Sequence, residues 1–419
     1  MHVIHENMMN KKYKFNRTVL IRERRFMNRI IIFTGKGGVG KTSVAAAHAR
    51  KASKEGKKTL IVSTDMAHNL SDLFEQSLGK EEKQVADHLY ALEIDPTYEM
   101  EHDFSSMMNA FAQMLPGGSG EENIMDGLDM IPGIEELFSL LKIQEIYNQK
   151  KYDLVIVDCA PTGETLSLLK FPELLSWYME KLFPLGKVAM KVMRPVSKKF
   201  FQIQLPDTKA MNDIERMYLK LAELQNLIKN REVCSIRLVA IPEKMVVEET
   251  KRNYMYLNLY NFNVDGLYMN RVLPADMDNP FFDEWLMIQQ QYITELEEVF
   301  RGVPVYSIKW YDIDLNGLTS LDRVCEDALQ EEDLFAVKRI IPNEVYEKTE
   351  DGYLLKVYLP CVNKEDIVMH EAGRDLIVKI GNFKRAIPMP SSLRGYSVQS
   401  AKMRDQSLVI QFVKEDEDE

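Results

Sequence analysis

A glycine-rich segment between a predicted strand and a predicted helix constrains this fold more than any other feature. Residues 30–33 are four consecutive apolar residues, which is typical of a short buried parallel strand. Residues 35–42 read Gly-Lys-Gly-Gly-Val-Gly-Lys-Thr, and the alanine-rich residues 43–49 favour a helix. Strand, glycine-rich loop and helix in this order form the P-loop pattern, which predicts an α/β P-loop NTPase fold with a mostly parallel sheet.

This loop is predicted to hold the phosphates of ATP. Glycines let backbone N–H groups turn toward phosphate oxygens, and the N-terminus of the following helix adds a partial positive charge. Lys41 is expected to reach the β- and γ-phosphates, and the Thr42 hydroxyl is expected to coordinate Mg²⁺. The predicted nucleotide-binding residues of the loop are Gly35, Lys36, Gly37, Gly38, Val39, Gly40, Lys41, Thr42 and Ser43.

Two further apolar runs have acidic residues at or just after their carboxyl ends. Residues 59–63 form a predicted strand that leads to Asp65, and residues 152–157 form another that ends at Asp158. An acidic residue at the carboxyl end of a buried strand, downstream of a P-loop, suits a Mg²⁺ site. Asp158 is therefore predicted to hold Mg²⁺ through a water molecule.

Lys36, near the start of the loop, is a second lysine that an ordinary P-loop does not need. With it the loop resembles the deviant P-loop ATPases, a group that includes the nitrogenase iron protein and the cell-division and partition ATPases. The resemblance implies that Lys36 crosses a dimer interface to the nucleotide of the partner subunit. A homodimer is therefore predicted.

The two segments that follow the acidic strands narrow this resemblance. Residues 64–74 and 158–166 resemble the two switch segments of the arsenite-pump ATPases and the tail-anchored-protein targeting ATPases, over about residues 28–330. The chain departs from the family pattern by having Met66 for proline, Cys159 for threonine and Glu164 for histidine.

The family resemblance also implies catalytic roles. Asp65 matches the aspartate that orients the attacking water, so Asp65, Lys36 and Lys41 are the predicted catalytic residues. A helix N-cap is the alternative role for Asp65. His68 is either a structural switch residue or a catalytic one.

The same resemblance assigns residues to the adenine. Residues 234–240 and 264–271 are two more predicted strands. Asn270 matches an asparagine that hydrogen-bonds adenine, and Glu243, 27 residues earlier, matches a glutamate at the nucleotide. An amide donates and accepts at once, which suits a purine edge. The alternative is that both are turn residues at strand ends.

A helical insert is predicted within about residues 96–225, and it is rich in methionine. Methionine is flexible and polarizable, so it suits surfaces that accept varied apolar partners. In the targeting ATPases a helical subdomain at this place receives the transmembrane helix of a client. A hydrophobic client segment or a membrane-protein partner is therefore predicted, and a helical core with a solvated basic face is the alternative.

Cysteine and charge patterns limit the other partners. The four cysteines, Cys159, Cys234, Cys325 and Cys361, match neither the metalloid site of the pump ATPases nor an interfacial Cys-x-x-Cys zinc pair, so we expect core thiols in a reducing cytoplasm. A net charge of −11 argues against nucleic acid as the main partner. No apolar run is long enough to predict a transmembrane segment.

Past residue 342 the apolar pattern changes to a period of two, which predicts an all-β, immunoglobulin-like sandwich. Residues 359–367, 376–385 and 387–390 resemble the α-crystallin domain of small heat-shock proteins. The resemblance leaves two roles open: this domain either holds unfolded clients or acts as a structural or docking domain.

The predicted organisation is a basic tail (1–28), a P-loop ATPase domain (29–330), a linker (331–344), an α-crystallin-like domain (345–414) and an acidic tail (415–419). The residues before Met27 are expected to be dispensable, as a tail or a mis-assigned start. We expect a Mg²⁺-dependent ATPase that couples ATP hydrolysis to the handling of a client protein or membrane partner. The alternatives are the catalytic subunit of an arsenite efflux pump and a nucleotide-gated scaffold with little turnover.

Overall fold

The structure is a computed structural model, and it describes residues 28–65, 69–102, 134–159, 208–277, 279–338, 343–373 and 375–414. Several predicted features lie outside these residues. They are the basic tail, Met66 and His68, most of the helical insert, the second switch beyond Cys159 and the acidic C-terminal tail.

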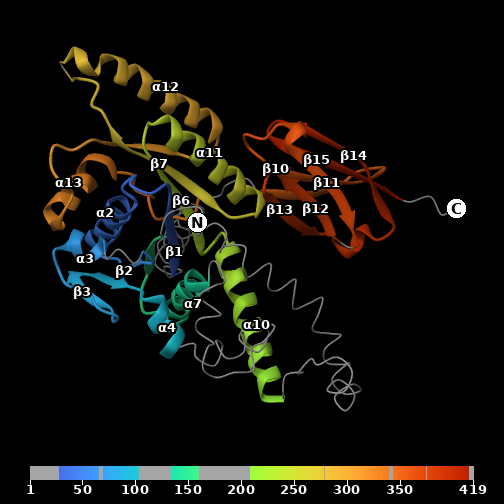
Figure 1. The fold of residues 1–419 in the computed structure, drawn as a ribbon, viewed down its shortest axis with the longest axis horizontal. Helices are drawn as coiled ribbons and strands as arrows, with labels where there is room; N and C mark the ends of the chain where they lie inside the picture. Colours follow the sequence, from blue (N-terminus) through green and yellow to red (C-terminus); the bar gives the residue numbers. More distant parts are fainter. Residues whose placement is uncertain are drawn as a thin grey trace, which may run out of the picture.

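A sheet of eight strands forms the centre of the larger domain (Figure 1). Its order is β3-β4-β2-β5-β1-β6-β7-β8, and every neighbouring pair is parallel except β3 with β4. The strands are β1 (Arg29–Thr34), β2 (Thr59–Ser63), β3 (Lys83–Ala86), β4 (Leu89–Glu93), β5 (Leu154–Asp158), β6 (Cys234–Ala240), β7 (Val264–Val272) and β8 (Val305–Lys309). The predicted α/β fold is confirmed, although β3, β4 and β8 were not predicted.

The four central strands are buried along their whole length, which explains their continuous apolar runs. Every residue of β1, β2, β5 and β6 is buried. Helices cover both faces of such a parallel sheet, so no strand position is left for alternating polar residues. The apolar residues of the sheet and helices form a single core.

The helices around the sheet place the loops at its edge. They are α2 (Lys41–Lys54), α3 (Asn69–Phe74), α4 (Pro96–His102), α7 (Ile134–Asn148), α10 (Thr208–Lys229), α11 (Lys244–Leu259), η1 (Pro280–Phe282), α12 (Asp283–Val299) and α13 (Gly317–Ala328). α2 packs on the strands and against α13, whereas α11 packs on β6 and β7 and against α12 (Figure 1). Within the described residues no helix is long and apolar enough to cross a membrane.

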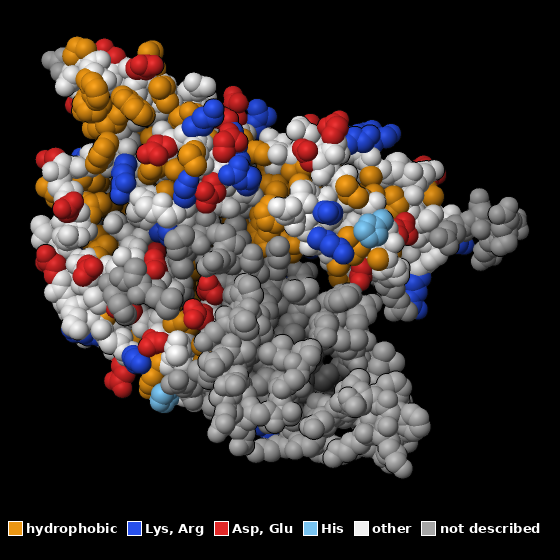
Figure 2. Space-filling view, in the orientation of Figure 1, with side chains coloured by type: hydrophobic (Ala, Val, Ile, Leu, Met, Phe, Trp, Pro, Cys, Tyr) orange, Lys and Arg blue, Asp and Glu red, His pale blue; other side chains and the backbone are white. Residues whose placement is uncertain are grey.

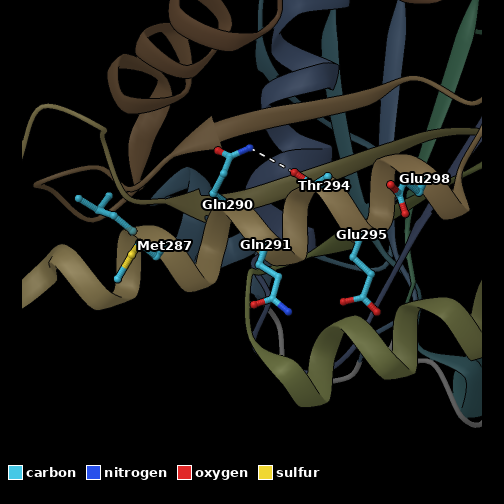
Figure 3. Close-up of a pocket in the computed structure, with 7 residues that line it drawn as sticks. Met287, Gln290, Gln291, Thr294, Glu295 and Glu298 are labelled. Atoms are coloured by element: carbon cyan, nitrogen blue, oxygen red, sulfur yellow. Dashed lines mark hydrogen bonds between the residues drawn. The ribbon is translucent and has the colours of Figure 1, made fainter.

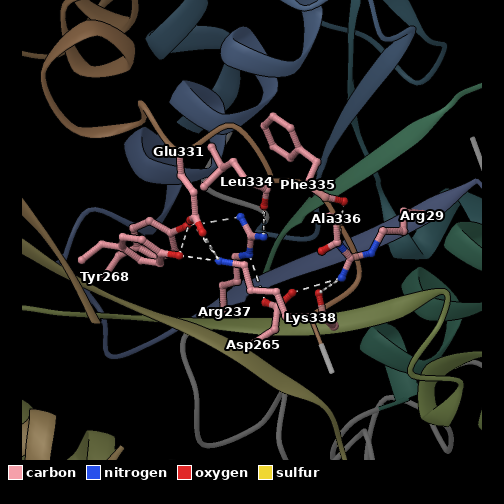
Figure 4. Close-up of polar contacts among 11 residues, drawn as sticks. Arg29, Arg237, Asp265, Tyr268, Glu331, Leu334, Phe335, Ala336 and Lys338 are labelled. Carbon is pink, nitrogen blue, oxygen red and sulfur yellow. Dashed lines mark hydrogen bonds and ion pairs between the residues drawn. The ribbon is translucent and has the colours of Figure 1, made fainter. Parts of the chain in front are cut away.

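A buried ionic network joins the central strands to the chain that follows α13 (Figure 4). The Asp265 carboxylate lies 3.0 Å from a guanidinium nitrogen of Arg29 and 3.0 Å from one of Arg237. Both arginines also donate to backbone carbonyls within residues 334–336, at 2.5–2.7 Å. The first part of the predicted linker is therefore bound to β1 and β6 of the large sheet.

Two antiparallel sheets make up the smaller domain, and they confirm the predicted all-β sandwich. One sheet has the order β14-β15-β10-β9 and the other the order β11-β12-β13 (Figure 1). The strands are β9 (Glu344–Lys348), β10 (Gly352–Tyr358), β11 (Ile367–Ala372), β12 (Asp375–Ile380), β13 (Phe383–Pro388), β14 (Tyr396–Arg404) and β15 (Ser407–Lys414). Buried side chains between the sheets include Leu355, Val357, Leu376, Val378, Ile387, Ile410 and Phe412.

The sandwich is docked on the carboxyl end of α11. The Arg385 side chain is 5% exposed and donates to the Leu259 carbonyl at 2.5 Å and to the Glu344 carboxylate at 2.6 Å. The Tyr260 hydroxyl donates to the Lys384 carbonyl at 2.5 Å. The bonds that involve Leu259 and Tyr260 cross from one domain to the other, so the two domains share a polar contact and not only a connecting chain.

Aromatic side chains extend this contact along α11. Tyr256 lies 4.8 Å, centroid to centroid, from Phe383 of β13, and Tyr254 lies 6.4 Å from Tyr358 of β10, both edge to face. The Asn343 amide donates to the backbone carbonyl of Phe262, beyond the end of α11, at 2.8 Å. The two domains therefore meet along the carboxyl-terminal half of α11 and just beyond its end.

Candidate active site

The P-loop connects β1 to α2 with two glycines in left-handed conformations. Gly38 has φ = 80° and Gly40 has φ = 87°, a region that residues with a side chain rarely adopt. No side chain caps the N-terminus of α2 at Gly40. The first N–H groups of this 14-residue helix therefore face the loop, as a phosphate site requires.

The two lysines of the loop point to different places. Lys41 is 7% exposed, and its ammonium lies 3.3 Å from the backbone carbonyl of Lys36, across the loop. The Lys36 ammonium instead lies 3.6 Å from the Glu249 carboxylate on α11. The Lys41 side chain thus contacts its own P-loop, while the Lys36 side chain points toward α11.

Asp158 ends β5 in the middle of the sheet, level with Phe33 of β1 and Ser63 of β2. It is 1% exposed, and neither carboxylate oxygen makes a well-formed hydrogen bond to a described residue. Burial raises its pKa to about 7, with a smaller contribution from Asp65, while the Thr42 hydroxyl and the Lys41 ammonium oppose the rise.

These neighbours fit the predicted magnesium ion. A buried carboxylate without a partner, beside a hydroxyl, supplies the oxygen ligands and the negative charge that Mg²⁺ prefers. Thr42 and Asp158 would hold it, with Asp158 acting directly or through water. Their roles remain predictions, and the geometry agrees with them.

Asp65 lies two residues after β2, on the side of the sheet where Asp158 ends β5. Its backbone N–H donates to the Ser63 hydroxyl at 3.1 Å, and its carboxylate accepts a bond from the Asn69 amide at 3.2 Å. α3 is described from Asn69 onward, and residues 66–68 lie outside the described residues, so both roles of Asp65, catalytic residue and helix N-cap, stay predictions. This placement leaves its carboxylate near the Mg²⁺ and phosphate region.

The structure brings Asn270 to the P-loop. Asn270 lies toward the carboxyl end of β7 and is 4% exposed, and its amide nitrogen donates to the Val39 carbonyl at 2.9 Å. Glu243 lies at the N-cap position of α11, where its side chain is exposed and makes no capping bond. Sequence reasoning missed Glu249 opposite Lys36, because no local pattern marks a glutamate that pairs across the fold.

A groove of about 690 Å³ runs along α12, beside α11 (Figure 3). Its lining includes Met287, Gln290, Gln291, Glu295 and Glu298. Two carboxylates and no cation make it unsuited to phosphates. In Figure 2 apolar side chains gather over the nearby end of α12, where Trp285 is 51% exposed.

All four cysteines are free thiols. Cys159, Cys234 and Cys325 are buried, as predicted, and burial raises the pKa of the first two to about 12. Cys361 is exposed, so the expectation of a core thiol is wrong for it; it lies in the turn after β10, with φ = 61°. Among the described residues no three His, Cys, Asp or Glu side chains are placed to hold a metal ion together.

Comparisons with known proteins agree with this site and with both domains. Residues 28–330 match the family model of the anion-transporting ATPases, and residues 350–412 match that of the HSP20-like domain found in ArsA. The chain is 35% identical to a putative arsenical pump-driving ATPase of Prosthecochloris vibrioformis, over 92% of this chain and 96% of that protein.

Two further relatives differ in name and in how much of the chain they match. The chain is 33% identical to putative arsenical pump-driving ATPase 1 of Aquifex aeolicus, over 91% of this chain and 99% of that protein. It is 29% identical to the ATPase get3 of Pyrenophora tritici-repentis, over 71% of this chain and 90% of that protein. A P-loop at the carboxyl edge of a parallel sheet, the family match over residues 28–330 and the relatives together show that the chain belongs to the anion-transporting ATPase family and is an ATPase that carries the HSP20-like domain found in ArsA.

Proposed function

We propose that this protein is a homodimeric, Mg²⁺-dependent ATPase that couples ATP binding and hydrolysis to the handling of a client protein or membrane partner. One observation supports the homodimer. Lys41 stays over its own loop, whereas Lys36 in the same loop reaches outward to Glu249 on α11. A lysine in this outward position is available to the nucleotide of a second subunit, as the family resemblance implies.

Each residue of the site has a separate task in this proposal. Lys41 and the N–H groups at the start of α2 bind the β- and γ-phosphates of ATP. Thr42 and Asp158 would hold Mg²⁺, which would neutralise charge on the phosphates. Asp65 orients the attacking water and accepts its proton, and the partner's Lys36 stabilises the charge that develops on the transferred phosphoryl group.

Two observations support a client protein as the cargo. Relatives over 71% of the chain include proteins named get3 and ASNA1 homologues, and an HSP20-like domain is fused to the ATPase. The methionine-rich stretches expected to receive the client lie outside the described residues. We place the protein in the cytoplasm, because its four cysteines are free thiols, as in reducing compartments.

A metalloid efflux pump is the second candidate, favoured by the names of relatives that match more than 90% of the chain. Arsenite binds to sets of thiolates, which are soft ligands. Three of the four cysteines are buried, and they lie on β5, β6 and α13, or directly beside these elements. Among the residues that the structure describes, no three His, Cys, Asp or Glu side chains are placed to hold an ion together, which argues against a shared metalloid site.

Steady-state ATPase measurements on the full chain separate the candidates. We expect ATP turnover that arsenite leaves unchanged, and ATP-dependent capture of a hydrophobic helical peptide. A charged helical peptide of the same length is the matched control. Stimulation by arsenite would favour the pump, and wild-type protein that binds ATP without turning it over would favour a scaffold.

A further inference from the structure

The P-loop is pressed against the ends of two neighbouring strands. A Cβ atom on Gly35 would lie 2.2 Å from the Val239 carbonyl oxygen of β6. A Cβ atom on Gly40 would lie 2.4 Å from the amide nitrogen of Asn270 on β7. Neither distance leaves room for any side chain, so β6 and β7 determine the shape of this loop.

The contact with β7 is a hydrogen bond as well as a close approach. The Asn270 amide nitrogen donates to the Val39 carbonyl at 2.9 Å, and both residues are buried, at 4% and 0% exposed. That carbonyl belongs to the peptide that joins Val39 to Gly40. A peptide is planar and its N–H points opposite to its C=O, so holding the carbonyl also orients the Gly40 N–H.

This peptide needs a constraint because glycine follows it. Gly40 has φ = 87°, and a glycine can leave that conformation easily because it has no side chain to restrict it. If the peptide rotated, its carbonyl oxygen would turn into the loop where the N–H groups must face phosphate oxygens. A carbonyl there would repel the phosphates.

We propose that Asn270 is a positioning residue for phosphate binding, which acts through the peptide between Val39 and Gly40. This role is separate from the adenine contact that the family resemblance implies. The amide has a second N–H and an oxygen, so one side chain is able to bond the loop and the base together. The inference depends on the ATPase site and is independent of the dimer and the client.

Inorganic tripolyphosphate separates the two roles, since it has the phosphates of ATP without the base. We would measure its binding and that of ATP to the full wild-type chain and to Asn270→Ala, with Mg²⁺, by calorimetry. A lost buried hydrogen bond weakens binding by roughly five- to tenfold, and we expect this loss for both ligands. Weaker ATP binding with tripolyphosphate binding unchanged would overturn the proposal.

Asn270→Asp is a second variant that keeps the volume of the side chain and leaves no cavity. Its carboxylate has no donor and would face the Val39 carbonyl, so we expect tripolyphosphate to bind more weakly than to Asn270→Ala. If this variant bound tripolyphosphate as the wild type does, Asn270 would have no positioning role.

Asn263→Ala is the matched control. Asn263 directly precedes β7 at its other end, is 3% exposed, and its side-chain amide has no hydrogen-bond partner among the described residues. Truncating it removes a buried amide of the same size far from the loop. We expect unchanged tripolyphosphate binding, and an equal loss in this control would mean that any cavity beside β7 loosens the site.

Discussion

The ammonium of Lys36 lies 3.6 Å from the carboxylate of Glu249, so an ion pair within one chain joins the P-loop to α11. The two side chains are 31% and 27% exposed. A pair this accessible to water contributes only about 0–1 kcal/mol, because solvent screens it. Lys36 therefore has a defined resting position that a phosphate group is able to displace.

Mixing two inactive variants tests whether Lys36 acts across a dimer. Lys36→Ala and Asp65→Asn should each lose ATPase activity by about 10³-fold, the scale of a charge supplied by a partner protein. In a mixed dimer one site keeps Asp65 and receives the intact Lys36 of the other subunit. Equal mixing gives about half mixed dimers with one complete site each, hence about a quarter of wild-type activity.

The ATPase activity of the mixture, after the subunits have exchanged, is the measurement. A mixture as inactive as its components would contradict action across a dimer. Glu249→Gln is the control for the resting ion pair. It should change the activity by less than about fivefold, because the pair it removes is weak.

Asp158 gives the stability a particular pH dependence. Its pKa is raised from 3.8 to about 7, mainly by burial, so the folded protein binds this proton more tightly than the unfolded chain does. The free energy of unfolding should therefore fall as the pH rises from about 4 to about 7. Asp158→Asn removes this titration, so it should be more stable at pH 8 by about 1–3 kcal/mol, while losing ATPase activity.

Urea unfolding at several pH values, without nucleotide or Mg²⁺, measures this dependence. Asp314→Asn is the control, because it removes a carboxylate that the fold leaves exposed to water. Equal slopes for the wild type and Asp158→Asn would show that the buried carboxyl does not titrate in this range.

The network around Asp265 should be among the costliest to break. Asp265→Asn keeps the shape of the side chain but leaves Arg29 and Arg237 buried without a carboxylate, which typically costs about 3–5 kcal/mol. The same change at Asp312, which is 77% exposed and pairs with Arg323, should leave the stability nearly unchanged. Chemical denaturation compares the two, and similar losses would mean that the buried network does not stabilise the fold.

Arg385 is expected to hold the smaller domain in place. Arg385→Ala removes two interactions and leaves the Leu259 carbonyl and the Glu344 carboxylate unsatisfied, at a cost of about 1–3 kcal/mol. Small-angle scattering should show a larger radius of gyration, and proteases should separate the domains sooner. The exposed Arg394→Ala is the control, and identical behaviour of the two variants would place the docking contact elsewhere.

The P-loop and the central strands could be predicted because their signals are local. A run such as residues 30–33, followed by glycines and a helix, is recognised from residues that are adjacent in the sequence. Asp158 could be predicted for the same reason, since the end of a buried parallel strand opens on the ligand edge of such a sheet.

Other features depend on contacts that no local pattern records. Arg29 and Arg237 look like breaks in apolar strands, yet each pairs with Asp265, which lies 236 residues from Arg29 along the chain. The bond from Asn270 to Val39 spans 231 residues. The short strand β3 begins with two exposed polar residues and pairs with β4 through a tight turn, so no apolar run marked it as a strand.

Arg29 also determines when the larger domain is able to finish folding during synthesis. It lies in the first strand, but the carbonyl of Phe335 that it bonds is made 306 residues later. At about 5–20 residues per second, a ribosome needs roughly 15–60 seconds to cover that distance. Until then Arg29 can pair with Asp265, but the backbone carbonyls of Phe335 and Ala336 that complete its bonding do not yet exist, so a ribosome-bound chain that ends before Leu334 should remain open to proteases at β1. The P-loop is therefore synthesised early, but the bonds that hold the strand before it are completed only 306 residues later.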